Sequence, residues 1–165
     1  MTKEVEKAKE SYKRWLQGFN SRDRDAMVAE IHFPHLRLSG SNQIQVWHTA
    51  LDINAKFDEQ TQKLKEEGWV RTDSRCIEAF QKGPDKVHLT MVQSRIHSDG
   101  SEYNRFQTLW IFIRENENGE LSSDLPFWLT LQKVLISGRC NNKMRCVTNH
   151  RIPRVSLVWK TLGWP

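Results

Sequence analysis

Hydrophobic residues near the start of the chain recur every three or four positions. Val5, Ala8, Tyr12, Trp15 and Phe19 follow this spacing, and charged residues occupy many of the positions between them. The period is typical of an amphipathic helix whose apolar stripe faces a core. The pattern therefore predicts a first helix that contains these five positions.

Two further helices are predicted from capping signals. Asp23 follows a run of turn-forming residues and can cap a short helix that carries Ala26, Met27, Val28 and Ile31. Thr49 and Asp52 have the spacing of a capping box, which marks the start of a helix. This third helix is only weakly amphipathic, with Leu51, Phe57 and Leu64 as its apolar positions, and Gly68 is suited to end it.

Alternation of apolar and polar residues predicts strands in the rest of the chain. Short strands are expected around 36–38 and 44–48, and long ones over 69–80, 86–97 and 103–114. The connections Lys82-Gly83-Pro84-Asp85 and Ser98-Asp99-Gly100-Ser101 are good turn sequences, so the long strands should form an antiparallel meander.

A fourth long strand is signalled at Asn118-Gly119 but is not evident in the residues that follow. Residues 121–126 lack alternation, and Pro126 is unfavourable in a central strand. Residues 127–136 could supply the strand, or could form a short helix.

This order of elements predicts an α+β fold, with three N-terminal helices packed on a curved antiparallel sheet. The 165 residues suit one domain, placed at 1–120, and an irregular basic tail at 121–165. The net charge of +5 comes from that tail, which holds seven basic residues and one acid. Because those charges are dispersed and match no known motif, we do not expect nucleic acid as a partner.

Several segments resemble the SnoaL-like branch of the nuclear-transport-factor-like superfamily, which has a cone-shaped, cystatin-like fold. They span residues 5–119 and are Tyr12-Lys13-Arg14-Trp15, Gly18-Phe19-Asn20-Ser21-Arg22-Asp23, His32-Phe33-Pro34-His35-Leu36-Arg37-Leu38, Glu67-Gly68-Trp69, Gly83-Pro84-Asp85-Lys86-Val87-His88 and Thr108-Leu109-Trp110-Ile111. The resemblance implies an interior pocket between the helices and the sheet, and a homodimer. It ends after Gly119, and a frameshift or a gene-model join would explain the change.

Three residues are candidates for catalysis: His32, His35 and Arg37, with Trp47 or His48 close by in the paired strand. A histidine can move a proton near neutral pH, and an arginine can hold an anionic or enolate oxygen. The alternative is structural: His32 caps the end of the second helix and Arg37 lies on the surface.

The carboxylates Asp52, Asp73 and Glu78 are candidates for a general base. Glu78 shares strand parity with Cys76 and Phe80, so it could point inward with them. The alternative, that Glu78 is a solvated strand residue, is favoured because a lone buried acid is costly.

Aromatic residues could line a pocket for an apolar ligand, although core packing explains the same residues. The predicted ligand-binding set is Tyr12, Trp15, Phe19, Trp47, Glu78 and Trp110, with Trp69 and Phe106 as further aromatic candidates.

The sequence predicts neither a metal site nor a cofactor. Cys140, Cys146 and His150 lack a fourth ligand, and no phosphate-binding loop or other catalytic motif is present. No signal peptide or apolar stretch of membrane-spanning length is found, so a cytoplasmic protein without a membrane partner is expected.

Together these observations predict a protein that binds a small, mostly apolar organic ligand, with cofactor-free acid–base catalysis (isomerisation, dehydration or cyclisation) as an extension. The alternative is a non-catalytic dimerisation or binding module, because a fold alone does not imply an activity.

Overall fold

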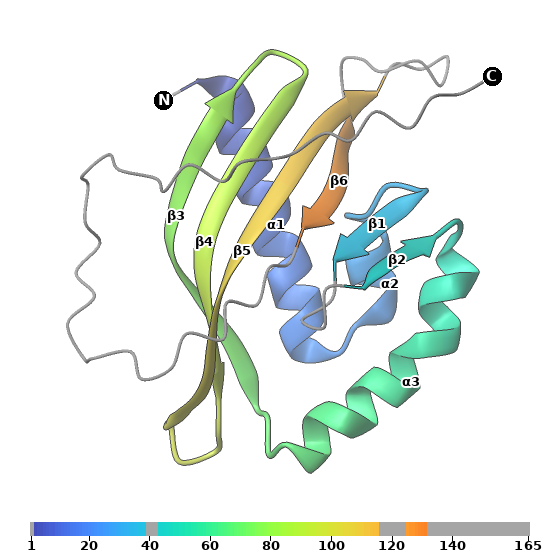
Figure 1. Ribbon diagram of the computed structural model, residues 1–165, viewed down its shortest axis with the longest axis vertical. Coiled ribbons are helices and arrows are strands. Elements are labelled where there is room, and N and C mark those ends of the chain that lie inside the picture. The colour runs from blue at the N-terminus through green and yellow to red at the C-terminus, as the bar shows by residue number, and fades with distance from the viewer. Residues whose placement is uncertain (1, 39–42, 116–124, 132–165) are drawn as a thin grey trace.

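The computed structural model describes residues 2–38, 43–115 and 125–131 of the chain (Figure 1). Its elements follow the order α1 (Lys3–Ser21), α2 (Arg24–Val28), β1 (His35–Leu38), β2 (Ile44–Trp47), α3 (Ala50–Glu66), β3 (Arg71–Lys82), β4 (Lys86–Ile96), β5 (Glu102–Glu115) and β6 (Leu125–Leu131). All three predicted helices and the predicted meander are present. Residues 132–165, which make up most of the predicted tail, lie outside the described residues.

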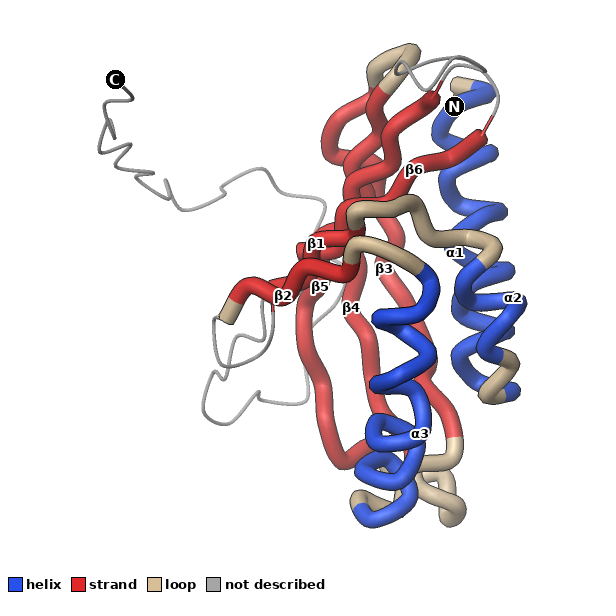
Figure 2. Tube along the Cα trace, turned by 90° about the vertical axis from the view of Figure 1, so that its right-hand side faces the viewer, coloured by secondary structure: helices blue, strands red, loops and turns tan. Residues whose placement is uncertain are grey.

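The strands form one six-stranded sheet in the order β2-β1-β6-β5-β4-β3. Every neighbouring pair is antiparallel except β1 and β6, which run parallel. Figure 2 shows the three helices on one side of the bent sheet. The α+β fold predicted from the sequence is therefore confirmed.

Strand β6 fills the place of the fourth long strand that the sequence signalled only weakly. Of the two alternatives for residues 127–136, the strand is present over 125–131, so the sheet continues past residue 120. Pro126 pairs with Arg114 of β5, whereas β1 joins β6 only at Thr130 and Leu131. The proline thus lies where β6 has a single hydrogen-bonded neighbour, which is a position that tolerates a missing N–H.

The main core lies between α1 and the long strands. Val5 and Tyr12 are fully buried and pack against Leu89 and Met91 of β4 and Trp110 of β5. The residues of β4 alternate between the two faces, and Val87, Leu89 and Met91 of one face belong to this core. The amphipathic stripe of the first helix therefore packs as predicted.

A tight turn brings α2 against the end of α1. Arg22 adopts the left-handed conformation with φ of 55°, and the Asp23 carboxylate accepts a hydrogen bond of 3.0 Å from the Ala26 backbone N–H. A Cβ atom at Gly18 would lie 3.1 Å from the Met27 backbone nitrogen, so the close approach of the helices needs glycine there. The helix ends at Val28, and Ile31, which was expected within it, lies beyond its end.

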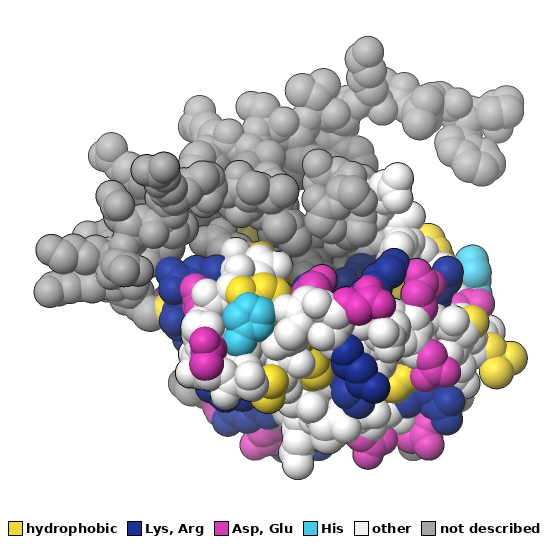
Figure 3. All heavy atoms as spheres, turned by 90° about the horizontal axis from the view of Figure 1, so that it is seen from below, with side chains coloured by type: hydrophobic (Ala, Val, Ile, Leu, Met, Phe, Trp, Pro, Cys, Tyr) yellow, Lys and Arg dark blue, Asp and Glu magenta, His cyan; other side chains and the backbone are white. Residues whose placement is uncertain are grey.

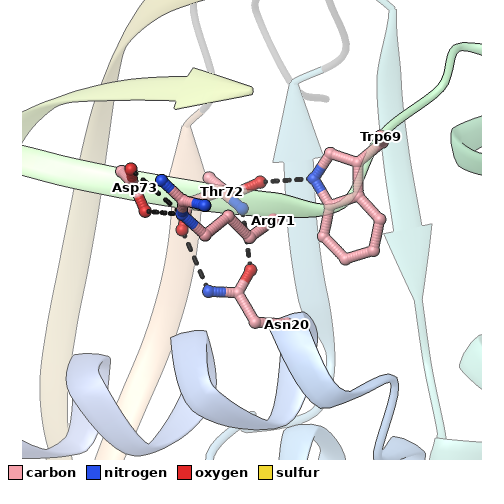
Figure 4. Close-up of polar contacts among 5 residues, drawn as sticks. All are labelled: Asn20, Trp69, Arg71, Thr72 and Asp73. Atoms are coloured by element: carbon pink, nitrogen blue, oxygen red, sulfur yellow. Dashed lines mark hydrogen bonds and ion pairs between the residues drawn. The ribbon is translucent and has the colours of Figure 1, made fainter. Parts of the chain in front are cut away.

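Asn20 fastens the end of α1 to the start of β3 (Figure 4). Its side-chain amide donates to the Thr72 carbonyl at 3.0 Å and accepts from the Thr72 N–H at 2.8 Å. The Trp69 indole donates to the Thr72 hydroxyl at 3.0 Å, and the neighbouring Arg71 and Asp73 form an ion pair at 3.0 Å. The two hydrogen bonds between Asn20 and Thr72 thus attach the C-terminal end of α1 to β3.

Helix α3 crosses the lower end of the molecule and begins and ends as predicted (Figure 1). The capping box of Thr49 and Asp52 is formed, and Gly68 follows the helix with φ of 71°. Only Ile53 and Leu64 of this helix are buried. Phe57, in the middle of the helix, is partly buried and packs against the cluster of Phe19, Met27 and Leu64.

The face of the described part that is seen from below is mixed in charge (Figure 3). Seen from below, basic and acidic side chains lie side by side, with single hydrophobic side chains between them (Figure 3). None of the helices in the described ranges is long and apolar enough to span a membrane.

Candidate functional site

A cavity of about 670 Å³ lies between α3 and the concave face of the sheet. It is lined by residues from all three helices and from β1 to β5: Trp15, Phe19, Met27, Ile31, His35, Arg37, Gln45, Val46, Trp47, Asp52, Ile53, Ala55, Lys56, Phe57, Glu59, Gln60, Lys63, Thr72, Gln93, Arg95, Phe106, Thr108 and Trp110.

The floor of the cavity changes from apolar to polar along β4. Leu89 and Met91 lie under α1, and the next two residues of the same face, Gln93 and Arg95, line the cavity. Gln93 is paired with Ser74 of β3 on one side and Phe106 of β5 on the other. Because alternate residues of a strand point to the same side, one face of β4 contributes both to the core and to the cavity lining.

Aromatic rings form the wall nearest α1. Trp15 contacts Trp110 edge to face, with ring centroids 4.6 Å apart, and stacks on Phe19 at 5.2 Å. Of the residues predicted to bind ligand, Trp15, Phe19, Trp47 and Trp110 line the cavity. Because these rings also pack against one another, the wall of the cavity is part of the core, as the sequence analysis expected.

Tyr12, which was predicted to bind ligand, lies outside the cavity lining and is fully buried. Its hydroxyl is hydrogen-bonded to Ser74 Oγ at 2.5 Å and accepts from Gln93 Nε2 at 2.8 Å. Burial raises the pKa of Tyr12 to about 12, although the two hydrogen bonds oppose the shift. Tyr12 therefore holds the Gln93 side chain through this hydrogen bond from the core, outside the cavity lining.

Glu78, also predicted to bind ligand, is exposed and lies outside the cavity lining. The inward orientation considered for it assumed regular alternation, but the register between β3 and β4 shifts between Arg75 and Glu78, and Cys76 has a φ of 53°. This β-bulge breaks the parity on which the prediction relied. The solvated alternative describes its position.

Two of the three predicted catalytic residues line the cavity from β1. His35 is 3% exposed, and its ring stacks on that of Trp47, with centroids 5.3 Å apart. The Arg37 guanidinium lies 5.9 Å from the centre of the Trp47 ring. The third, His32, is half-buried before the strand and is not part of the lining.

Burial lowers the pKa of Arg37, and the positive charge of Arg95 lowers it further. Since a guanidinium keeps its proton in proteins, the lowered pKa of Arg37 indicates that burial and the charge of Arg95 make its charged form less favourable here. An anion placed between them would reduce that cost.

Arg95, which the sequence analysis did not select, is the second cation of the floor. Its Nη1 contacts the Glu67 carboxylate, which also accepts from the Tyr103 hydroxyl at 2.9 Å, and its guanidinium lies 5.8 Å from the Phe106 ring. Its parity with Leu89 in β4 was the signal that could have identified it.

Two donors that line the cavity have no hydrogen-bond partner in the described part of the chain: Trp15 Nε1 and Thr108 Oγ1. Both atoms are buried, and Thr108 is 3% exposed. Buried donors are usually satisfied, so these two atoms stand out among the polar groups beside the cavity.

The carboxylates of the site lie on α3 and are engaged by neighbouring groups. Asp52 Oδ2 accepts from the backbone nitrogens of His48 at 2.6 Å and Thr49 at 3.0 Å, so this candidate base is a helix cap. Glu59 forms ion pairs with Lys63 at 2.7 Å and Lys56 at 3.5 Å. Asp73, the other carboxylate candidate, is exposed on β3.

Within the described ranges, no group of three or more His, Cys, Asp or Glu side chains could hold a metal ion. The spacing of Cys140, Cys146 and His150 that was considered from the sequence lies outside these ranges.

The fold is similar to that of several solved structures, all of low sequence identity. Aln2 from a Streptomyces species aligns with a TM-score of 0.57 at 10% identity, over 80% of this chain and 93% of the other. An NTF2-like protein with a cystatin-like fold from Novosphingobium aromaticivorans aligns with a TM-score of 0.57 at 15% identity, over 81% and 82%. A protein from Catenulispora acidiphila, solved in complex with S-DNPA, aligns with a TM-score of 0.50 at 8% identity, over 76% and 90%.

No protein with curated annotation matches the sequence. The model of one family, described as NTF2-like protein (DUF6841), matches residues 4–122, which include all the described elements except β6. The residues named above for the cavity lining all lie within the matched segment. The resemblance drawn from the sequence motifs is therefore confirmed. The chain belongs to this family of NTF2-like proteins.

Proposed function

We propose that the protein binds a small, mostly apolar organic molecule in the cavity between α3 and the sheet. The observation that carries the proposal is the cavity of about 670 Å³, which has an aromatic wall and a few polar groups on its floor. Ligand pockets of proteins usually have volumes of about 300–1,000 Å³ and this kind of lining. The structure from Catenulispora acidiphila, which contains S-DNPA, supports the idea that this fold accommodates a small molecule.

A blocking substitution on α3 tests the proposal. Ala55 is exposed on the helix and lines the cavity, so Ala55→Trp would put a large ring into the cavity without disturbing the core. Gln62→Trp introduces the same side chain at an exposed position of the same helix outside the lining, and is the matched control.

The probe is N-phenyl-1-naphthylamine, a neutral compound that becomes fluorescent in apolar surroundings. We expect Ala55→Trp to weaken its binding by at least about tenfold, a loss of about 1.4 kcal/mol, while Gln62→Trp binds like the original protein. Equal binding by all three proteins would place the probe elsewhere and contradict the proposal.

A second function, cofactor-free proton transfer, is favoured by the position of His35. Its buried ring and the Arg37 guanidinium come from the same face of β1 and line the same cavity. A base next to a cation can remove a proton and stabilise the oxyanion that forms. His35 would be the base and Arg37 the stabilising group.

The ring opening of 5-nitrobenzisoxazole tests for such a base. In this reaction a base removes the carbon-bound proton, the N–O bond breaks, and the products are a nitrile and a phenolate. We expect His35→Gln to lower the rate by at least about tenfold relative to the original protein. Equal rates would argue for a binding module without this chemistry.

The homodimer and the cytoplasmic location remain predictions from the sequence. A dimeric binding module is compatible with the same cavity, because binding and association do not require catalysis.

A further inference from the structure

The lining of the cavity is richer in cations than in anions. Among the described lining residues, Arg37, Lys56, Lys63 and Arg95 are cationic, whereas only Asp52 and Glu59 are carboxylates. Glu59 is about half exposed and is paired with both lysines, so the charges of these three α3 residues partly offset one another and are partly solvated. Asp52 is held by backbone N–H groups at the start of the helix. Two further cations, Arg37 and Arg95, lie on the floor, where Arg95 is ion-paired with Glu67.

The two arginines reach the cavity from different parts of the sheet. Arg37 is on β1 and Arg95 is on β4, and the strands β6 and β5 lie between them. Both side chains nevertheless line the same cavity, and the charge of Arg95 acts on Arg37. The curvature of the sheet thus directs two like charges into one space, where each makes the other less stable.

Both guanidiniums are also held in place. Arg95 is fixed by Glu67, which in turn accepts a hydrogen bond from Tyr103. Arg37 lies over the ring of Trp47. Side chains that are already ordered lose less entropy when they bind a ligand.

The unpartnered donors supply an independent observation. Thr108 Oγ1 and Trp15 Nε1 are buried in the cavity wall without a hydrogen-bond partner among the described residues. Leaving a buried donor unsatisfied costs free energy, and a ligand with acceptor atoms would recover that cost where a small rotation of Thr108 or Trp15 turns the donor into the cavity. A carboxylate offers two oxygens and a bidentate geometry that matches a guanidinium.

We propose that the ligand is an aromatic carboxylate, with its anionic group held by Arg37 and Arg95 and its ring packed against Trp15 and Trp110. The proposal rests on the proposed binding function and specifies its ligand class. The aromatic wall provides the contact for the ring, and the cationic floor provides the counter-charge.

A pair of isosteric probes separates the charge from the shape of the ligand. The acid is 2-naphthoate and its neutral counterpart is 2-naphthamide, each titrated calorimetrically into the full-length protein at neutral pH. We expect the acid to bind about tenfold to a hundredfold more tightly than the amide, since hydrogen bonds to charged groups are stronger than neutral ones.

Substitution of each arginine identifies the groups responsible. Arg37→Gln and Arg95→Gln should each remove most of the preference for the acid and leave the affinity for the amide within about threefold. Arg71→Gln is the control, because Arg71 is an exposed arginine of β3 outside the lining. The comparison of acid and amide on the unsubstituted protein stands even where a variant is unstable.

Three results would overturn the proposal. The first is equal binding of acid and amide that Ala55→Trp abolishes, which would leave the proposed binding function intact. The second is a preference for the acid that survives both arginine substitutions. The third is the absence of binding by either probe at about 1 mM, which would count against aromatic ligands altogether; binding of N-phenyl-1-naphthylamine would then decide separately whether the cavity is a binding site.

Discussion

Arg22 is expected to hold α3 against the rest of the molecule. Its Nε and Nη2 donate to the Thr61 hydroxyl at 3.0 and 2.7 Å, and its guanidinium lies 4.3 Å from the centre of the Phe57 ring and 5.0 Å from that of Phe19. Thr61 and Phe57 belong to α3, whereas Arg22 and Phe19 belong to the end of α1. Replacing Arg22 by alanine therefore removes a set of polar and ring contacts that join the two helices.

The magnitude follows from these contacts. A hydrogen bond from a charged donor contributes about 1.5–3 kcal/mol and a cation–π contact about 0.5–2 kcal/mol, but contacts made by one group are not additive. Burial opposes these contacts, because it disfavours the charged form of Arg22 and so lowers its pKa. We expect Arg22→Ala to lower the free energy of unfolding by about 2–3 kcal/mol.

Urea unfolding followed by tryptophan fluorescence measures this loss, and Trp69 is a local reporter because its ring lies 5.9 Å from the guanidinium. Arg24→Ala is the matched control, since Arg24 is exposed and pairs only with its neighbour Asp25 at 3.2 Å among the described residues. Arg22→Gly removes the same side chain but suits the left-handed backbone, so it should be about 1 kcal/mol more stable than Arg22→Ala. A loss below about 0.5 kcal/mol, or one no larger than that of Arg24→Ala, would refute the reasoning.

Other predictions address the attachment of α1, the buried tyrosine and the oligomeric state. Asn20→Ala leaves the N–H and carbonyl of the buried Thr72 without their side-chain partner and should cost about 2–3 kcal/mol in urea unfolding, whereas Ser21→Ala at an exposed position should cost less than about 0.5 kcal/mol. The pKa of the Tyr12 hydroxyl is raised from 10.0 to about 12 in the folded state, so the folded protein keeps this proton at a pH where the unfolded chain has lost it. The free energy of unfolding should therefore fall between pH 10 and about pH 12, and the fall should be smaller in Tyr12→Phe. Light scattering after size exclusion should give twice the mass of the 19.5 kDa chain, and a monomer at about 10 μM would contradict the predicted homodimer.

Local signals in the sequence predicted most of the elements correctly. The stripe of α1 and the capping box of α3 each depend on residues that are close in sequence, and such patterns are visible before any tertiary contact is known. The same applies to the turns that join β3, β4 and β5. Strand β6 was harder to predict, because its position between β5 and β1 depends on pairing with segments far away in the chain.

The candidate site was predicted only in part. His35 and Arg37 were selected for their chemistry, and the structure brings both to the cavity from one face of β1. Parity failed at Glu78, because the bulge in β3 has no clear sequence signal and changes the face on which the residues after it lie. Arg95 was missed although parity would have found it, since a charged residue at the end of an apolar face is usually taken to be exposed.

Helix α3 explains why the cavity exists at all. The sequence predicted a weakly amphipathic helix, and the structure shows that only Ile53 and Leu64, near its two ends, are buried. Between them, Phe57 packs against a core cluster, and the polar residues Lys56 and Gln60 line the cavity. A helix that contacts the core through few apolar residues leaves space beside it, whereas a fully amphipathic helix would close onto the sheet. The absence of a continuous apolar stripe in residues 50–66 is therefore the sequence feature that keeps the cavity open, and apolar substitutions at Lys56 and Gln60 should shrink it.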